Sequence, residues 1–276
     1  MVNKFISITL FAIIISFTMS CGGKSTNTTK DMSDFSEEKS FKDAHDSPKD
    51  IDAKLANEMV TFPTPDGKEG SAYMIKSKTD SDKYLFVIHE WWGLNDHIKQ
   101  EAERYAEALG DVNVMALDLY NGNVADNPDD ASRFMKAVKE DRAEAVVKGA
   151  LAMAGKNAKI GTIGWCFGGG WSLKSALLAG KQADACVIYY GMPVNDAKQL
   201  ATLDTDVLGI WADKDQWITP EVAKKFGSVM KATGKKFISH SFDADHAFAN
   251  PSSERYVETA ATEANKIALE YLKARL

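Results

Sequence analysis

Hydrophobic and polar positions follow two periods from about Met59 to the end of the chain. Short apolar runs such as "YLFVIHE" and "KIGTIGW" are typical of buried strands. Longer segments between them repeat their apolar residues every three to four positions, as amphipathic helices do. Strands that alternate with helices predict a mostly parallel sheet with helices on both faces. The pattern therefore predicts an α/β fold, in which reactive groups gather beyond the carboxyl ends of the strands.

The same pattern sets the order of the elements. Residues 59–75 predict two short strands around a turn at residues 65–67. Thr219 followed by Pro220 predicts the start of a helix, because Thr suits the N-cap and Pro suits the first turn. Further strands are predicted at 84–90, 112–120, 159–165, 184–191, 206–213 and 236–242, and helices at 97–109, 127–153, 168–178, 220–233 and 252–276.

The first 20 residues have the pattern of an export signal, with one basic residue, Lys4, before an apolar run over residues 5–17. Small residues and Cys21 follow, and the arrangement resembles a bacterial lipoprotein signal, in which that cysteine becomes the lipidated first residue. Thr18 departs from this pattern, which usually has leucine there. We expect an exported protein held in the bacterial cell envelope by a lipid on Cys21. An ordinary cleaved signal or an uncleaved anchor is the alternative.

Residues 21–55 are rich in Ser, Thr, Asp and Lys and contain few branched apolar residues. Such a composition does not repay the entropy lost when a backbone becomes ordered. We therefore predict a disordered tether over residues 21–55, in which His45 has no function. A single folded domain is predicted over residues 56–276.

Composition narrows the class of protein. The chain has 276 residues, is 45% hydrophobic and carries a formal net charge of -6. It is long enough for a full hydrophobic core. The acidic balance and the lack of clustered Lys or Arg argue against a nucleic-acid-binding protein.

The stretch "GWCFGG" places a cysteine, Cys166, where a predicted strand ends and a helix begins. Gly164 and Gly168 lie two residues to either side of it. A sharp strand-to-helix turn needs small residues there, as in the G-x-S-x-G nucleophile elbow, here with Cys in place of Ser. The turn lifts the sulfur clear of the sheet and sets it at a helix N-terminus, which favours thiolate.

This stretch has two other interpretations. A phosphate-binding loop is disfavoured, because no Gly-Lys-Ser/Thr ending and no G-x-G-x-x-G is present. Cys166 could instead be a small buried hydrophobic residue, or half of a disulfide with Cys186. Cys186 lies inside the apolar run "DACVIYY", which favours core packing for it.

A thiol nucleophile needs a base, and the base needs an acid that orients it. Of the five histidines, His246 lies in a loop between the last predicted strand and the last helix. His89, His97 and His240 fall in or beside regular elements. Asp215 follows the preceding strand, with Asp213 as a less favoured neighbour. The chain order Cys166, Asp215, His246 is that of α/β-hydrolases.

No metal or organic cofactor is predicted, because the histidines and cysteines do not follow metal-ligand spacing along the chain.

The chain resembles the dienelactone hydrolases (carboxymethylenebutenolidases) over about residues 60–276. The motifs that carry the resemblance are "HEWWGLN", "DLY", "GWCFGG", "DKDQWITP" and "DHAF". The resemblance implies an α/β-hydrolase fold with Cys166 as nucleophile, and with Asp215 and His246 completing the triad.

It also implies that Glu90 engages the cysteine in the resting enzyme. The oxyanion hole would come from the main-chain N–H groups of Trp91 and Phe167.

Substrate-binding residues follow the family pattern less closely. Members of the family hold a substrate carboxylate with cationic and phenolic side chains. Arg133 is the cationic candidate here, and Trp92 and Tyr120 are further candidates for the substrate pocket. The acidic residues Asp126, Asp129 and Asp130 would repel an anion. All six tryptophans lie near Glu90, Cys166 or Asp215, as in an aromatic pocket, although large side chains also pack at such sheet ends.

The function expected from these features is hydrolysis of a small ester or lactone through a thioester acyl-enzyme. An esterase, thioesterase or acyltransferase for a larger envelope substrate is one alternative, and a non-catalytic lipoprotein that binds a ligand is another.

Overall fold

A computed structural model describes residues 31–276 of the chain. The predicted export signal and Cys21 lie outside the described residues. Within the part of the chain that is described, no helix is both long and apolar enough to cross a lipid bilayer.

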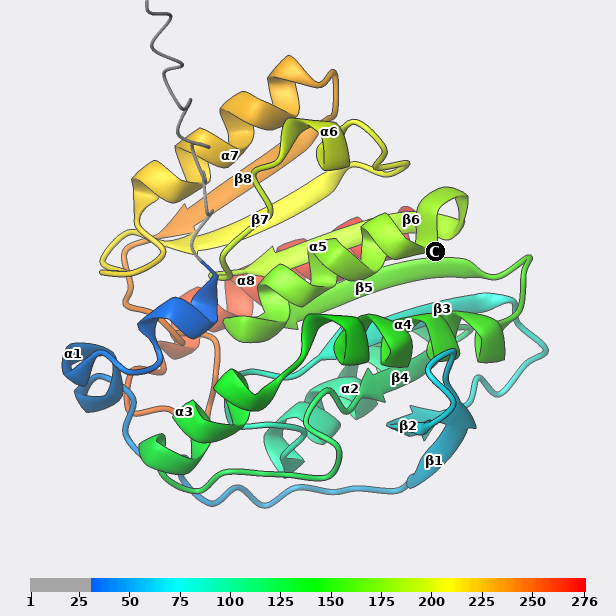
Figure 1. The fold of residues 1–276 in the computed structure, drawn as a ribbon, viewed down its shortest axis with the longest axis horizontal. Helices are drawn as coiled ribbons and strands as arrows, with labels where there is room; N and C mark the ends of the chain where they lie inside the picture. The colour runs from blue at the N-terminus through cyan, green and yellow to red at the C-terminus, as the bar shows by residue number, and fades with distance from the viewer. Residues whose placement is uncertain (1–30) are drawn as a thin grey trace, which may run out of the picture.

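One twisted sheet of eight strands runs through the centre of the molecule (Figure 1). The strand order is β1-β2-β4-β3-β5-β6-β7-β8. β1 and β2 are antiparallel to their neighbours, and the remaining strands are mutually parallel. The strands are β1 (Glu58–Pro63), β2 (Glu69–Ile75), β3 (Lys83–Ile88), β4 (Asn113–Leu117), β5 (Lys159–Trp165), β6 (Ala183–Tyr189), β7 (Val207–Ala212) and β8 (Phe237–Phe242).

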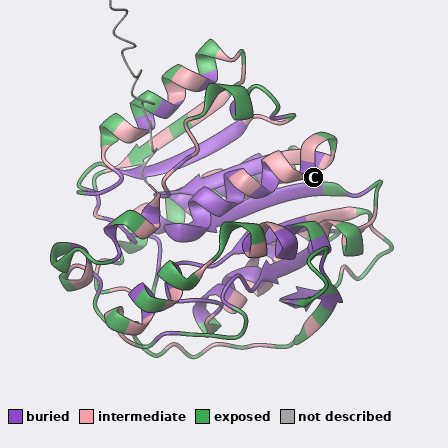
Figure 2. Cartoon of the chain, viewed as in Figure 1, coloured by how far each residue is buried: buried purple, intermediate pink, exposed green. Residues whose placement is uncertain are grey.

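Helices cover both faces of the sheet. α4 and α5 pack against each other on one face, and α2 and α8 pack against each other on the opposite face (Figure 1). The central strands are buried along almost their whole length, as strands covered on both sides must be (Figure 2). The helices are η1 (Met32–Phe35), α1 (Lys39–Asp43), α2 (Asp96–Leu109), α3 (Pro128–Ala137), α4 (Glu140–Ala154), α5 (Phe167–Ala179), η2 (Gly180–Gln182), α6 (Ala197–Leu200), α7 (Pro220–Ala232) and α8 (Glu258–Lys273).

The α/β-hydrolase architecture predicted from the sequence is confirmed, with differences at the ends of two helices. The helix predicted over 127–153 is divided into α3 and α4, because Val138 and Lys139 have extended backbones. The C-terminal helix begins at Glu258 rather than near residue 252, since turns occupy the residues between.

The largest departure from the sequence prediction concerns residues 31–55, which were expected to belong to a disordered tether. They form η1 and α1 and pack across the edge of the sheet where the parallel strands end (Figure 1). Three apolar side chains in this otherwise polar stretch explain the difference: Met32, Phe35 and Phe41 are all buried. Burying each such side chain contributes roughly 1.5–3 kcal/mol, which offsets part of the conformational entropy lost when the segment becomes ordered.

Polar contacts hold the same segment in place. The Ser132 hydroxyl donates to the carbonyl of Ser36 at 2.8 Å, and the Lys49 N–H donates to the carbonyl of Ser252 at 2.9 Å. We call residues 31–48 the N-terminal strap.

Candidate active site

Cys166 occupies a strained turn between β5 and α5. It is the N-cap of α5 and has φ 55° and ψ -118°, a conformation that costs a non-glycine residue roughly 1–3 kcal/mol. A Cβ at Gly164 would lie 2.1 Å from the carbonyl oxygen of Gly168, and a Cβ at Gly168 would lie 2.3 Å from that of Ile88. Only glycine fits at these two positions, as the elbow interpretation requires.

His246 and Asp215 form a buried pair at the same edge of the sheet. Nδ1 of His246 lies 2.6 Å from Oδ2 of Asp215, and both residues are nearly inaccessible to solvent. Oδ1 of Asp215 accepts hydrogen bonds from the N–H groups of Trp217 and Ile218, each at 2.9 Å. Asp215 is thereby fixed after β7, whereas Asp213 is exposed.

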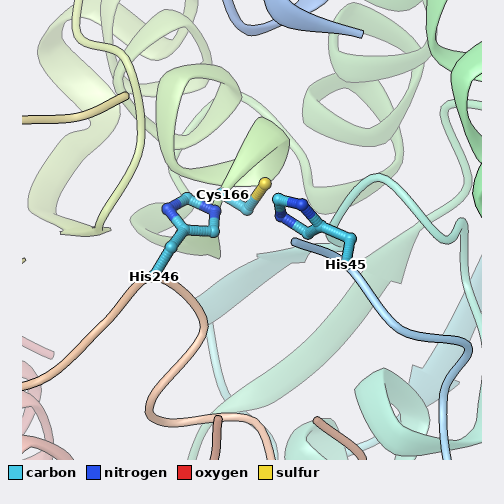
Figure 3. A group of neighbouring side chains, drawn as sticks. All are labelled: His45, Cys166 and His246. Atoms are coloured by element: carbon cyan, nitrogen blue, oxygen red, sulfur yellow. The ribbon is translucent and has the colours of Figure 1, made fainter. Parts of the chain in front are cut away.

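The sulfur of Cys166 lies between two imidazole rings, those of His246 and His45 (Figure 3). One ligand-type atom from each of these three residues lies within 4.8 Å of the other two. The strap brings His45 to the sulfur, whereas the sequence placed this residue in a disordered tether. His45 is 7% exposed, and its Nδ1 lies 2.6 Å from the carbonyl oxygen of Phe41.

The surroundings shift the pKa values of the two histidines in opposite directions. Burial, and after it the neighbouring His246, lower the pKa of His45 to about 3. Burial also opposes a charge on His246, but the charges of Asp215 and then of Cys166 more than offset it and hold its pKa well above the ordinary value. Burial would raise the pKa of Asp215, yet His246 and the two N–H donors keep it below its usual value.

Glu90 is a buried carboxyl group beside this cluster. Burial raises its pKa to about 7, although His246 and Asn250 partly oppose that shift. Its Oε2 accepts a hydrogen bond from the Asn250 side chain, and its Oε1 has no partner among the described residues. The Asn250 amide oxygen in turn accepts from the N–H and the hydroxyl of Ser252.

His89 links the loops after β3 and β4. Its Nδ1 lies 2.6 Å from the carbonyl of Glu90, and its Nε2 accepts from the N–H of Leu119 at 3.2 Å. The ring is fully buried and its pKa is lowered, chiefly by burial. A neutral imidazole satisfies both bonds, so His89 fixes the loop that carries Glu90 and Trp91.

The two residues expected to supply oxyanion-hole donors lie at neighbouring strand ends. β3 pairs with β5 through Ile88 and Gly164. Trp91 follows Ile88 by three residues, and Phe167 follows Gly164 by three and begins α5. Their main-chain N–H groups therefore lie at the same edge of the sheet as Cys166.

The residues proposed for substrate binding are only partly brought together. Tyr120 is buried against His89 and Phe167, and Trp92 is buried against Trp91. Arg133 is not part of the buried cluster: its side chain is 66% exposed and forms an ion pair with Asp130.

Some of the tryptophans pack against the strap, and others pack elsewhere. Trp91 and Trp217 each pack edge-on against Phe41 of the strap, with ring centroids 5.1 Å apart. Trp165 and Trp211 pack instead against Tyr189 and Phe237. An aromatic wall therefore surrounds the cysteine, but only some of the tryptophans form it.

The cysteines do not form the disulfide that was weighed as an alternative. Cys166 and Cys186 are both free and buried. Burial raises the pKa of Cys186 to about 11, and its sulfur lies 3.7 Å from the Ser172 hydroxyl inside the core.

Sequence reasoning missed His45, Phe41 and Asn250. Asn250 could have been found only from weak features of the sequence. It precedes a proline, a pair that commonly begins a turn, and it lies in the same loop as the candidate histidine. The strap left a signal in the spacing of Met32, Phe35 and Phe41, which give a polar segment an apolar side. No local feature indicates that His45 reaches Cys166, 121 positions later in the printed sequence.

Known proteins are similar to this chain in sequence and in fold. The profile of the dienelactone hydrolase family matches residues 71–276. Protein usf from Aquifex pyrophilus is 31% identical over 176 residues, which cover 57% of this chain and 75% of that protein. Carboxymethylenebutenolidase 1 from Cupriavidus pinatubonensis is 24% identical over 232 residues, which cover 79% of this chain and 97% of that enzyme.

Solved structures agree on the fold. A dienelactone hydrolase-like promiscuous phosphotriesterase from metagenomic libraries superposes with a TM-score of 0.68 at 22% identity, covering 80% of this chain and 99% of that one. An esterase from Pyrococcus furiosus superposes with a TM-score of 0.62 at 15% identity, covering 83% of this chain and 99% of that one. The chain therefore belongs to the dienelactone hydrolase family, a family of carboxylic ester hydrolases.

Proposed function

We propose that the protein hydrolyses a small ester or lactone with a Cys166–His246–Asp215 triad, through a thioester acyl-enzyme. The observation that carries the proposal is the strained elbow at Cys166 facing a histidine whose far nitrogen is bonded to a buried aspartate. Nucleophile, base and orienting acid in this arrangement are the components of a nucleophilic hydrolase.

In the first half of the cycle the Cys166 thiolate attacks the carbonyl carbon of the ester. The N–H groups of Trp91 and Phe167 stabilise the oxyanion of the tetrahedral intermediate. Its collapse breaks the bond to the leaving oxygen, which takes a proton from the His246 imidazolium. The product alcohol leaves, or in a lactone stays attached, and the acyl group remains on sulfur.

In the second half a water molecule attacks the thioester while His246 accepts its proton. Collapse of the second intermediate releases the carboxylic acid and regenerates the thiolate. Asp215 stays ionised throughout and holds the ring so that Nε2 faces the sulfur. Glu90 supports the resting state, since a carboxyl group with a pKa of about 7 can exchange a proton with its buried neighbours near neutral pH.

The surroundings favour an uncharged acyl group over a substrate carboxylate. Phe41, Trp91 and Trp217 form an aromatic wall, and the cation expected to bind an anion, Arg133, is exposed and paired with Asp130. Cys166 is only 2% exposed and His45 of the strap lies beside its sulfur, so we expect the strap to move before a substrate reaches that sulfur.

The test is hydrolysis of a panel of short esters, lactones and acyl thioesters by full-length protein. Iodoacetamide should alkylate Cys166 and abolish turnover, and Cys166→Ala should lose activity by about 10⁶-fold. Cys186→Ala is the matched control, because it removes a buried thiol outside the site and should retain turnover. Full turnover by Cys166→Ala would disprove the triad. Turnover confined to thioesters would point to the thioesterase or acyltransferase alternative.

We further propose that a lipid on Cys21 anchors the protein in the cell envelope. With the strap docked, only residues 22–30 separate that cysteine from Asp31. Nine residues span at most about 30 Å, so the catalytic domain would work close to the membrane surface. Membrane fractionation of cells that express the wild type or Cys21→Ser tests this, and unchanged fractionation of the variant would refute it.

A further inference from the structure

The group around Cys166 has a feature that ester hydrolysis does not require, namely a second imidazole on the far side of the sulfur. His45 and His246 flank Sγ (Figure 3), and their ring centroids are 5.3 Å apart. The three ligand-type atoms lie within 4.8 Å of one another. A triad needs one base, so His45 is left without a part in the chemistry.

Both rings are oriented in the way that metal-bound histidines are. Each Nδ1 has a hydrogen-bond acceptor, the Phe41 carbonyl for His45 and the Asp215 carboxylate for His246, both at 2.6 Å. A ligating imidazole almost always donates its other N–H to a carbonyl or carboxylate, which fixes the ring and frees the second nitrogen. In both residues Nε2 is buried and has no hydrogen-bond partner within residues 31–276.

We propose that His45 Nε2, His246 Nε2 and Cys166 Sγ together bind a borderline-soft metal ion, for which Zn²⁺ is the test ion. One thiolate and two imidazoles suit Zn²⁺, whereas Mg²⁺ and Ca²⁺ require oxygen ligands. Zinc bonds of 2.0–2.3 Å in tetrahedral geometry place ligand atoms roughly 3.5 Å apart, so the three side chains would close by about 1 Å. Three protein ligands leave the fourth position open to water.

The bound ion would switch the hydrolase off and hold the strap down. It would bind the Cys166 sulfur that attacks the ester and the Nε2 of His246 that carries the proton. It also joins the strap to the loop after β8 and to the elbow after β5. Removing the ion would free the thiolate and leave the strap held by its packing and its polar contacts.

Binding has a defined proton balance. If the thiol is protonated beside a neutral His246, forming the Zn–S bond sends the thiol proton to solvent. If the resting state is a thiolate beside an imidazolium, the proton leaves Nε2 of His246 instead. Either way one proton is released for each ion bound, a quantity that calorimetry in buffers of different ionisation enthalpy measures.

The experiment titrates Co²⁺, and then competing Zn²⁺, into metal-free full-length protein carrying Cys21→Ser, so that Cys166 and Cys186 are its only thiols. We expect one ion per chain and a thiolate-to-cobalt charge-transfer band that Zn²⁺ removes. His45→Ala should weaken binding at least 10-fold to 100-fold, the loss that follows removal of even an orienting partner of a metal ligand. Cys166→Ser should lose the band.

His240→Ala is the matched control, since it removes a partly exposed histidine on β8 outside the cluster. It should bind as the wild type does. His45→Gln is a second variant in case His45→Ala does not fold, and circular dichroism checks both. An unchanged band and affinity in the His45 variants would overturn the proposal, and so would a band that persists in Cys166→Ser or a stoichiometry of zero.

A separate measurement connects the ion to activity. Zn²⁺ should inhibit ester hydrolysis, a chelator should restore it, and the His45 variants should need a higher Zn²⁺ concentration for the same inhibition. Zn²⁺ that binds without inhibiting would refute the switch. If no ester is hydrolysed under any condition, the proposed function fails, while the cobalt band still decides whether the metal site exists.

Discussion

Two regions of the molecule each bring an imidazole to the same sulfur, and they shift the pKa of that imidazole in opposite directions. The loop after β8 holds His246 against a carboxylate, and the pKa of that ring is raised well above its ordinary value. The strap holds His45 against a backbone carbonyl, and its pKa falls to about 3. Both rings are buried, so the charge of the Nδ1 partner makes the difference.

The two proposals above give these histidines different roles, His246 as a base and His45 as a neutral ligand, and the difference has a physical reason. A buried imidazole can carry a proton only where a fixed negative charge compensates for its loss of water. The family domain supplies that charge through Asp215. The strap supplies only a dipole, so His45 stays neutral with its Nε2 lone pair free.

We expect the largest effect from Asp215→Asn, which gives His246 a neutral partner like that of His45 and so removes the difference between the two histidines. We expect the pKa of His246 to fall and kcat to drop by about 10⁴-fold, because an amide neither fixes the required tautomer nor stabilises the imidazolium. A pH–rate profile and NMR titration of the ring measure both effects. Asp213→Asn, an exposed neighbour, is the control, and an unchanged rate in Asp215→Asn would contradict the assignment.

The strap's own contribution is tested by Phe41→Ala. The ring is fully buried against Trp91 and Trp217, and losing it should weaken docking of the strap by about 3–5 kcal/mol. The rate at which iodoacetamide alkylates Cys166 in metal-free buffer should then rise by at least about 100-fold. Phe237→Ala removes a partly buried ring that packs on Phe226 and should raise the rate far less. Equal rates in the two variants would mean that general destabilisation, not undocking, exposes the thiol.

Glu90 is a buried acid whose charge no cation fully compensates, so burial shifts its pKa as it shifts that of His45, but in the opposite direction. Its pKa is raised from 4.5 to about 7, so the folded state binds more protons than the unfolded state between those values. Its contribution to stability is full below pH 4.5 and is lost as pH rises through 7, by up to about 3 kcal/mol. Urea unfolding at pH 5 and pH 8 should show a smaller difference for Glu90→Gln than for wild type. Glu107→Gln, at an exposed site, should leave the difference unchanged.

The smallest expected effect is the acid sensitivity of the strap. Because the pKa of His45 is lowered from 6.5 to about 3, the docked strap binds fewer protons than a free one, and docking weakens as pH falls below 6.5. At pH 5 the loss is about 2 kcal/mol. Limited proteolysis within residues 31–48, with a chelator present, should therefore be faster at pH 5 than at pH 7. His45→Gln should remove that pH dependence, and a wild-type strap equally resistant at both pH values would contradict the burial-driven shift.

Much of the fold could be predicted from the sequence, because the features that indicate each element lie in short stretches of neighbouring residues. Each strand of the sheet follows an apolar run, and the glycines around Cys166 mark a turn that no side chain at Gly164 or Gly168 would permit. The positions of Asp215 and His246 after successive strands followed from topology, since parallel strands end at one edge. Their roles in catalysis remain predictions.

The parallel sheet, the elbow and the family can be predicted from the chain alone, because hydrophobic periodicity and steric constraints act between residues that are close in sequence. The docking of residues 31–48, the position of His45 beside Cys166 and the exposure of Arg133 depend on contacts between residues far apart in sequence. Those outcomes depend on how Phe41, 50 residues before Trp91, packs against a surface formed by the ends of strands that lie far from it in sequence. Composition made the strap look disordered, yet the fit of Phe41 between two tryptophans supplies the burial energy that composition alone could not indicate.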